Sequence, residues 1–368
     1  MKYCNRCVMP DTKPGVRIDE KGVCSACRAV EAKKLINWEA RHEELKQICE
    51  DIKRTNTSCY DAIVPVSGGK DSQYQVWMMK EVFKMNVLCV CFSNHLPTEE
   101  GIYNLNQMVE AYGVDLVKVN VKNSAYRKLR RKAFFQIGEP SWAEHCGVFS
   151  SVANVALIYN VPIIMWGEDI AVEFGGKTSK VRKADARDIN RNDLIKGKNV
   201  IEWCDEDILE SDVFFFKYPA MEEFEKRGIK SLYLGYYHNW DGKLHYEHVQ
   251  KYGFQPRKKG PLKGNYLHYD NIDEKLCEIC IWLKYIKFGF WRPTDQCCYQ
   301  IWNGRMTRAE AVKIVNELSS QFPDEYFQDW LDYHMITENQ FWEVVEKYRN
   351  KNIWEKIGGE WRLKYPLI

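Results

Sequence analysis

A six-residue loop, Ser67-Gly68-Gly69-Lys70-Asp71-Ser72, carries residue types that together bind phosphate groups. Its two glycines leave backbone N–H groups open to an anion, and a helix that starts after them directs its positive end to the same point. Its serines add hydroxyl donors, its lysine adds a cation and its aspartate adds a carboxylate suited to Mg²⁺. The loop lacks the G-x-x-x-x-G-K-S/T pattern, so it is not a Walker A loop.

The residues around the loop predict the elements that position it. An apolar run at 61–66 predicts a buried strand that leads into the loop, and the pattern at 73–85 predicts an amphipathic helix that follows it. The alternation continues, with strands expected at 87–92, 115–121 and 161–166 and helices at 99–112 and 149–159. This order predicts an α/β fold, a mostly parallel sheet with helices on both faces.

In this setting the hexapeptide resembles the signature of the PP-loop ATP pyrophosphatase superfamily, whose fold is adenine nucleotide alpha-hydrolase-like. The resemblance implies an enzyme that splits ATP between its α and β phosphates, adenylylates a substrate oxygen and lets a nucleophile displace AMP. It implies catalytic roles for Lys70 and Asp71. It further implies nucleotide contacts at strand ends, at Cys91, Phe92, Ser93, Asn94, Gly167 and Glu168, and Mg²⁺ binding by Asp71 with Glu168 or Asp169. A solvated turn is the alternative interpretation of the last acidic pair.

Four of the fourteen cysteines have the spacing of a metal site, Cys4-x-x-Cys7 followed by Cys24-x-x-Cys27. Two such knuckles supply the four thiolates that Zn²⁺ takes in tetrahedral structural sites. Residues 1–30 are too few to bury a core of their own, so a metal ion is the natural source of their stability. Because four protein ligands leave no open position, we expect a structural or partner-facing role.

A second cysteine group is weaker evidence for a metal. Cys277 and Cys280 could combine with Cys297 and Cys298, but residues 276–286 have the pattern of an apolar helix. Cysteine is often a small core residue in such a helix. We therefore favour core packing for this group.

The chain of 368 residues is long enough for more than one domain. We expect a zinc-binding module at 1–30, a helical linker at 31–58, the PP-loop domain at 59–235 and a mostly helical region at 236–368. The polar segment 174–199 interrupts the pattern and is either a mobile loop near the active site or a solvated insertion.

Charge and hydropathy narrow the function classes. The net charge is +2, less than expected of a protein whose main task is to bind nucleic acid. No apolar run approaches the length of a membrane span, and the first residues lack the apolar core of a signal peptide. We expect a cytoplasmic protein with no membrane insertion and no nucleic-acid partner.

Motifs outside the loop resemble a particular family, the N-acetyl sugar amidotransferases. They are Cys4-Asn-Arg-Cys-Val-Met-Pro-Asp-Thr12, Lys284-Tyr-Ile-Lys-Phe-Gly289, Arg292-Pro-Thr-Asp295 and Gly304-Arg-Met-Thr-Arg-Ala-Glu-Ala311. The family belongs to bacterial surface-polysaccharide (O-antigen, lipopolysaccharide) and nonulosonic-acid biosynthesis. The resemblance implies that an acetamido group on a free or nucleotide-linked sugar is adenylated by ATP with Mg²⁺ and converted to an acetamidino group by ammonia.

The source of the ammonia follows from what the chain lacks. It begins Met-Lys, so removal of the methionine exposes no N-terminal cysteine nucleophile, and no Gly-x-Cys-x-Gly elbow is present. We therefore expect a separate glutaminase subunit of the class I amidotransferase type, as the family resemblance also implies.

The sugar pocket has only candidate residues in the sequence. They combine aromatic rings with polar or charged groups, although core packing explains the rings equally well. The candidates are His145, Cys146, Glu173, Lys177, Tyr236, Tyr237, Trp240, Asp241, Lys287 and Arg292.

Two other functions are compatible with parts of the pattern. A tRNA 2-thiouridine synthetase of the same superfamily also pairs cysteine knuckles with such a loop and would recruit Cys146, Cys277 and Cys280 to an iron–sulfur cluster. A zinc-ribbon scaffold with a degenerate ATP site is the non-enzyme alternative. The neutral charge and the motifs after residue 280 disfavour the first, and the intact loop disfavours the second.

Overall fold

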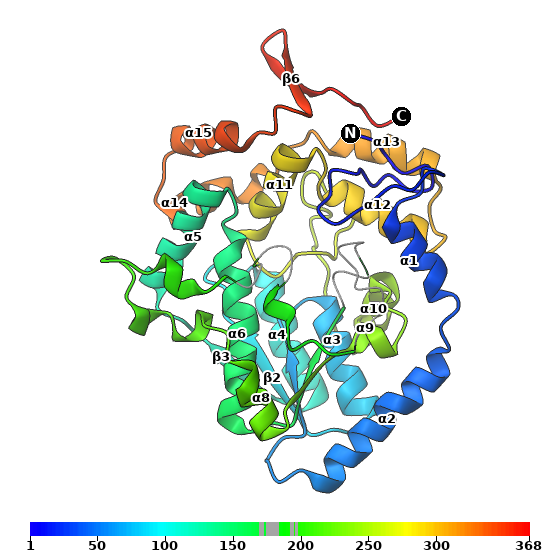
Figure 1. The fold of residues 1–368 in the computed structure, drawn as a ribbon, viewed down its shortest axis with the longest axis vertical. Helices are drawn as coiled ribbons and strands as arrows, with labels where there is room; N and C mark the ends of the chain where they lie inside the picture. Colours follow the sequence, from blue (N-terminus) through cyan, green and yellow to red (C-terminus); the bar gives the residue numbers. More distant parts are fainter. Residues whose placement is uncertain (169–172, 174–183, 192–194, 196–197) are drawn as a thin grey trace.

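The computed structural model describes residues 1–168, 173, 184–191, 195 and 198–368 (Figure 1). Asp169 and Lys177, and most of the 174–199 segment, lie outside the described residues.

The centre of the molecule is a parallel sheet of five strands in the described part of the chain, in the order β3-β2-β1-β4-β5. The strands are β1 (Ala62–Pro65), β2 (Val87–Phe92), β3 (Asp115–Val119), β4 (Ile163–Trp166) and β5 (Lys230–Tyr233). The first four confirm the strands predicted from the sequence. The fifth, Lys-Ser-Leu-Tyr, was not predicted because its exposed lysine and buried serine give it no apolar run.

Helices cover both faces of this sheet, as predicted (Figure 1). Apolar side chains alternate along the strands, so Ile63 faces one cluster and its neighbours Ala62 and Val64 face the other. The first face packs against α5 (Asn123–Ile137), α6 (Ser141–Tyr159) and α8 (Met221–Arg227). The second packs against α2 (Trp38–Thr55), α3 (Lys70–Trp77) and α4 (Glu99–Tyr112).

Three predicted helices differ from the structure in their bounds. The helical linker expected at 31–58 holds the end of one helix, α1 (Ser25–Lys33), and a second helix, α2, because the Asn37 side chain caps a new start by accepting from the Ala40 N–H. The helix expected at 73–85 begins at Lys70 and passes into a π-helical turn, η1 (Met78–Val82). The helix expected at 149–159 begins eight residues earlier, at Ser141, and its first turns bury Trp142, Ala143 and Cys146.

The region after the sheet is mostly helical, as predicted, and ends in a hairpin. Its helices are α9 (Leu234–Tyr237), α10 (Gly242–Val249), α11 (Cys277–Phe288), α12 (Arg292–Trp302), α13 (Arg308–Leu318), α14 (Phe327–His334) and α15 (Glu338–Tyr348). Strands β6 (Trp354–Ile357) and β7 (Glu360–Leu363) pair antiparallel and project from the molecule (Figure 1). Short 3-10 turns complete the described elements: η2 (Ile189–Arg191), η3 (Val200–Trp203), η4 (Glu210–Asp212), η5 (Phe214–Phe216), η6 (Gln250–Tyr252) and η7 (Asp324–Tyr326). None of the described helices combines the length and apolarity that a membrane crossing requires.

The N-terminal cysteine module lies against the C-terminal helices, beside α12 and α13 in Figure 1. Its buried Val8 and Met9 share one apolar cluster with Phe290, Ala311 and Val315. The module therefore borrows its core from residues almost 300 positions away, and its domain boundaries remain a prediction.

Candidate functional site

The loop after β1 lies where the sheet order reverses direction, between β2 on one side and β4 on the other. Ligands of open α/β sheets bind in the crevice outside the carboxyl ends of the strands at this point. Gly68 has φ +98°, and a Cβ there would stand 2.7 Å from the Gly101 carbonyl oxygen. The loop therefore needs a glycine at this position for both its conformation and its packing.

The hydroxyl groups of the loop brace its own backbone. The Ser67 N–H donates to the Ser72 Oγ at 3.4 Å, and the Ser72 hydroxyl donates to the Gly69 carbonyl at 3.0 Å. The Gly69 N–H donates to the Ser67 Oγ at 3.3 Å. These bonds hold the loop at the N-terminus of α3, whose N–H groups face an incoming anion.

Lys70 is buried between two carboxylates. Its Nζ lies 2.8 Å from Asp71 Oδ2 and 2.5 Å from Asp270 Oδ1. Burial alone would lower the pKa of Lys70, but Asp270 and Asp71 outweigh it and raise the pKa above its ordinary value. The ammonium group is therefore charged, and one of its three donors remains for a ligand.

Asp71 is held from a second side by a histidine of α10. His245 Nδ1 lies 2.7 Å from Asp71 Oδ1, and its ring stacks on Tyr74 at 4.0 Å between centroids. Burial would raise the pKa of Asp71, but the Lys70 charge and the His245 hydrogen bond hold the pKa well below its usual range. Asp71 is thus an ionised carboxylate with both oxygens already engaged.

The segment that supplies Asp270 runs on beside the loop. Its backbone pairs with residues 96–98, where the Thr98 N–H donates to the Asp273 carbonyl at 3.1 Å and the Lys275 N–H donates to the Leu96 carbonyl at 3.0 Å. Burial raises the pKa of Asp273, and the nearby Ser67 hydroxyl opposes this shift in part. The C-terminal region therefore forms one wall of the loop site.

The other residues predicted to contact ATP lie at this same edge of the sheet. Ser93 and Asn94 directly follow β2, and Gly167 and Glu168 directly follow β4. A Cβ on Gly167 would stand 2.6 Å from Gln75 Nε2. Burial, aided by the Asp71 charge, raises the pKa of Glu168 to about 7. The Asp71 charge therefore acts on Glu168, whereas Asp169 lies outside the described residues.

The loop offers Mg²⁺ few protein ligands. Among the described residues, the four N-terminal cysteines alone place three or more ligand atoms within 4.8 Å of one another. Mg²⁺ usually takes one or two carboxylates and completes its shell with phosphate oxygens and water. Asp71 and Glu168 are two carboxylates at this edge of the sheet, which is the number that such a Mg²⁺ site takes from the protein.

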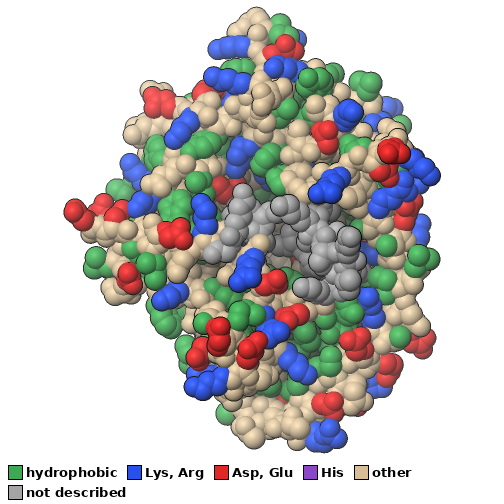
Figure 2. Space-filling view, viewed as in Figure 1, with side chains coloured by type: hydrophobic (Ala, Val, Ile, Leu, Met, Phe, Trp, Pro, Cys, Tyr) green, Lys and Arg blue, Asp and Glu red, His purple; other side chains and the backbone are tan. Residues whose placement is uncertain are grey.

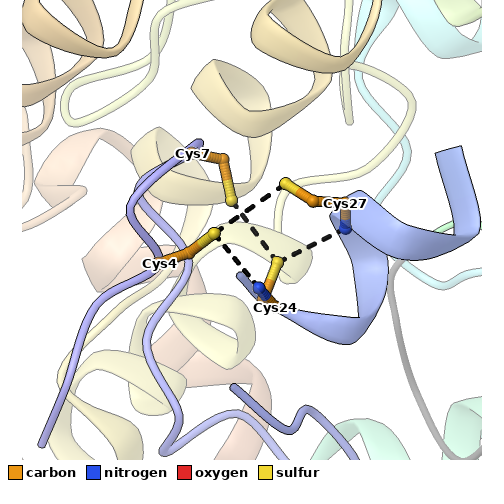
Figure 3. A group of neighbouring side chains, drawn as sticks. All are labelled: Cys4, Cys7, Cys24 and Cys27. Atoms are coloured by element: carbon orange, nitrogen blue, oxygen red, sulfur yellow. Dashed lines mark hydrogen bonds between the residues drawn. The ribbon is translucent and has the colours of Figure 1, made fainter. Parts of the chain in front are cut away.

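The four cysteines do fit a zinc ion (Figure 3). Their sulfur atoms converge, with Cys4 Sγ 3.9 Å from Cys27 Sγ and Cys7 Sγ 3.6 Å from Cys24 Sγ. Four thiolates at the Zn–S distance of ~2.3 Å stand about 3.8 Å apart in a tetrahedron. Backbone N–H groups point at the sulfurs, including that of Cys24 at 3.2 Å from Cys4 Sγ, and such bonds stabilise thiolate charge. All fourteen cysteines are described, and none forms a disulfide.

The second cysteine group is divided between two places. Cys297 and Cys298 belong to the cluster around the N-terminal module, whereas Cys280 lies beside Arg130, whose Nη2 donates to its sulfur at 3.3 Å. These four cysteines do not gather to within 4.8 Å in the described residues, and neither do Cys146, Cys277 and Cys280.

Most candidates for the sugar pocket have partners inside the protein. Asp241 accepts two bonds from Arg305 at 2.7 and 2.9 Å, and Lys287 bonds Glu139 at 2.6 Å. Two more form ion pairs: Glu173 pairs with Lys33, and Arg292 lies 3.7 Å from Glu278. His145 bonds the Ser141 carbonyl, and the Arg41 guanidinium lies over the Tyr236 ring. Tyr237 and Trp240 are buried. Cys146 instead lines a cavity of about 160 Å³ with Phe149, Asn190, Lys198 and Tyr218.

Sequence reasoning missed His245 and Asp270, which lie 174 and 200 residues after the loop positions they contact. Only the tertiary fold brings them to the loop. The acidic run Asp270-Asn-Ile-Asp-Glu274 was the one signal that could have marked the segment.

The loop, its place after β1 and the strand order together define the PP-loop class of ATP-using α/β proteins. Residues 264–366 match the family model described as "LPS biosynthesis protein WbpG-like, C-terminal domain". The match covers the C-terminal part of the chain and includes the motifs after Lys284, which confirms the resemblance that those motifs carry. The segment that matches includes Asp270 and Asp273.

Other similarities are more limited. An uncharacterized protein of Methanocaldococcus jannaschii is 33% identical over 118 residues, which cover 32% of this chain and 42% of that protein. The NH3-dependent NAD synthetase from Campylobacter jejuni, in complex with the nitrate ion, aligns with 50% of this chain and 99% of its own at 11% identity and a TM-score of 0.31. The U34-tRNA thiolase NcsA from Methanococcus maripaludis, with its 4Fe–4S cluster, aligns with 98% and 92% at 12% identity and a TM-score of 0.33. Similarities this distant say nothing about the activity of this chain.

Proposed function

We propose that this chain is an ATP-dependent amidotransferase that converts the acetamido group of an N-acetyl sugar into an acetamidino group, in the cytoplasmic stage of surface-polysaccharide biosynthesis. The main support is that the WbpG-like C-terminal domain contributes Asp270 to the lysine of the ATP loop. The domain that carries the family resemblance and the loop that carries the chemistry thus meet in one site.

The reaction has two steps. The amide oxygen of the sugar attacks the α-phosphorus of ATP, and pyrophosphate leaves from the loop. Ammonia then attacks the amide carbon, and the C–O bond breaks as AMP departs with its electron pair. Activation is necessary because an amide oxygen is a very poor leaving group until it is esterified.

Lys70 serves the first step. Because Asp71 and Asp270 hold its ammonium group in place and charged, it can neutralise the pyrophosphate without reorganising. Fixed charge of this kind accounts for much of the rate enhancement in phosphoryl chemistry. Mg²⁺ held by Asp71 would supply further charge neutralisation.

Zinc has a different place in the proposal. The cysteine module lies against α12 and α13, and a closed four-thiolate site has no position for a substrate. Zinc would therefore hold the module on the C-terminal domain. We further propose that ammonia comes from a separate glutaminase.

The thiolase alternative requires a cluster bound by Cys146, Cys277 and Cys280, which do not converge in the described residues. On the face shown in Figure 2, Lys and Arg side chains are interspersed with Asp and Glu. A purified protein with brown colour and iron–sulfur absorbance would favour the alternative over sugar amidination.

Mass spectrometry tests the proposal directly. A panel of free and nucleotide-linked N-acetyl sugars is incubated with the protein, ATP, Mg²⁺ and ammonium chloride. One sugar should lose the mass difference between oxygen and NH, with AMP and pyrophosphate released in equal amounts.

Loop variants supply the controls for this assay. Lys70→Ala and Asp71→Ala should abolish the mass shift, whereas Lys313→Ala, at an exposed position of α13, should keep it. Full activity in both loop variants would contradict the assignment. Pyrophosphate release without any amidinated sugar would point to a different acceptor.

A further inference from the structure

A second cluster of charged side chains lies next to the loop site, and the reaction steps proposed above do not use it. At its centre is Glu274, which is 4% exposed. Both of its carboxylate oxygens are buried, and neither makes a hydrogen bond within the described part of the chain. Burying a carboxylate without a hydrogen-bond partner costs free energy. An unpaired buried carboxylate therefore indicates a site for a bound ligand.

The backbone fixes where this carboxylate lies. Glu274 pairs with Pro97 in an antiparallel bridge. It directly follows Asp273, whose backbone lies against Gly101, and the Gly101 carbonyl in turn lies against Gly68 of the loop. Glu274 therefore lies next to the segment that packs on the ATP loop.

The groups around Glu274 come from three elements. They are Arg130 on α5, Glu144 on α6, and Asp273 and Glu278 before and on α11. Arg130 is fully buried and already committed to Glu144 at 2.8 Å, and Glu278 Oε1 makes no hydrogen bond of its own in the described residues. Arg292 lies 3.7 Å from Glu278 Oε1 and adds a second positive group. Negative groups still outnumber positive ones, and burial with the Glu144 charge raises the pKa of Glu274 well above its ordinary value.

This environment determines which ligand can bind. The ligand must be a cation and a hydrogen-bond donor, because Glu274 offers only acceptors once ionised. A chelated divalent ion does not fit, since no three of these carboxylates come within 4.8 Å of one another in the described chain. A small monovalent donor remains, and the proposed reaction consumes one: ammonium.

We propose that Glu274 binds ammonium and accepts its proton, so that ammonia is released next to the adenylated amide; this inference rests on the proposed function. Ammonium enters in exchange for the proton that Glu274 carries at rest, and that proton leaves to solvent. Bound ammonium then returns one proton to the carboxylate, and the lone pair of ammonia forms the C–N bond. The C–O bond to AMP breaks, the amidino group leaves protonated, and Glu274 is again in its resting form.

The test separates nucleophile activation from every other role of the residue. Glu274→Gln is compared with wild type using either ammonium chloride or hydroxylamine as nucleophile, with the sugar identified by mass spectrometry. Hydroxylamine is already unprotonated at neutral pH and needs no base. We expect kcat/KM for ammonium to fall by at least ~10²-fold, the usual contribution of a general base, while the hydroxylamine rate and ATP–pyrophosphate exchange stay at the wild-type level.

Ammonium binding gives a readout that needs no sugar. Replacing sodium chloride by ammonium chloride should raise the Tm of the wild type, leave Glu274→Gln unshifted, and raise the Tm of Glu317→Gln, a matched change at an exposed position of α13. Equal losses with both nucleophiles, or an ammonium shift that survives in Glu274→Gln, would overturn the assignment. If the wild type shows no ATP–pyrophosphate exchange with any sugar, the proposed function is wrong. The Tm comparison alone would then decide whether Glu274 binds ammonium.

Discussion

At the scale of single residues, the loop lysine depends on a partner that the sequence gives no reason to pair with it. Asp270 lies 200 positions after Lys70 and, together with Asp71, holds its ammonium group. The second carboxylate narrows the directions that the lysine can take. Positioning errors of about 1 Å cost on the order of 10²-fold in rate.

Asp270→Asn should therefore slow catalysis more than it weakens ATP binding. The amide keeps a hydrogen-bond acceptor but removes the charge, so we expect ATP–pyrophosphate exchange to fall roughly 10- to 100-fold. ATP affinity from titration calorimetry should change much less. Asp324→Asn, in an exposed pair with Lys263, is the matched control and should leave both measurements unchanged. If ATP–pyrophosphate exchange in Asp270→Asn equals that of the wild type, Asp270 does not position Lys70 for catalysis.

A histidine near Glu274 makes stability depend on pH. Burial, with the charges of Arg130 and Arg127, lowers the pKa of His95 to about 4. The unfolded chain binds this proton more readily than the folded one, so the stabilisation is complete above pH ~6.5 and is lost as the pH falls toward 4. His95→Gln, which can keep the bond to the Tyr333 hydroxyl, should lose less stability over this window.

Urea unfolding of both proteins at several pH values measures this difference. A difference on the order of 2 kcal/mol is expected, because each pKa unit corresponds to about 1.4 kcal/mol and solvent screens part of it. Parallel pH profiles for wild type and His95→Gln would assign the acid sensitivity to other groups.

At the scale of elements, the C-terminal wall of the site is held in place by the start of α4. A Cβ on Gly101 would stand 2.3 Å from the Asp273 carbonyl oxygen and 2.6 Å from its Cα. Gly101 sits in the first turn of the helix, where alanine would normally be favoured over glycine. The glycine is present because two backbones touch here.

Gly101→Ala should therefore destabilise the protein and displace the segment that carries Asp270. We expect a loss of roughly 1–3 kcal/mol in the free energy of unfolding, the range for overpacking, and lower exchange activity in the protein that remains folded. Gly228→Ala is the control: at φ +65° with open space around it, alanine costs about 1–2 kcal/mol in strain but should leave activity per folded molecule intact. Similar activity in the two variants would contradict the contact-based account.

The elements that sequence predicts well are those with a local signal. Four apolar runs predicted the strands β1 to β4. The residue types and spacing of the loop and of the cysteine knuckles predicted an anion site and a metal site. β5 was missed because Lys230 and Ser231 hide its pattern, and the His245–Asp71 bond was missed because no local signal links α10 to the loop. Contacts between residues so distant in sequence are decided by how whole elements pack.

At the scale of the molecule, the metal module and the ATP loop are joined by a chain of direct contacts. The Trp302 indole N–H at the end of α12 donates to Cys27 Sγ at 3.3 Å. Three residues later, Arg305 grips Asp241, the N-cap of α10, through two bonds. His245 of the same helix then holds Asp71. Each contact is buried or half-buried, so loosening the first can reach the last.

Removing the metal should therefore disturb α10 as well as the module. We expect one zinc per chain by elemental analysis, and a strong chelator or Cys7→Ser should lower the Tm by at least ~5 °C, given roughly 1 °C per kcal/mol at this chain length and the ~10 kcal/mol that structural zinc contributes. Amide hydrogen exchange should rise in α12 and α10 but not in α8 on the opposite face of the sheet. Cys59→Ser changes an exposed cysteine outside the site and should leave zinc content and exchange unaltered. If α10 keeps its protection after zinc loss while α12 opens, the module stabilises only its own surroundings, and His245 holds Asp71 without help from the metal.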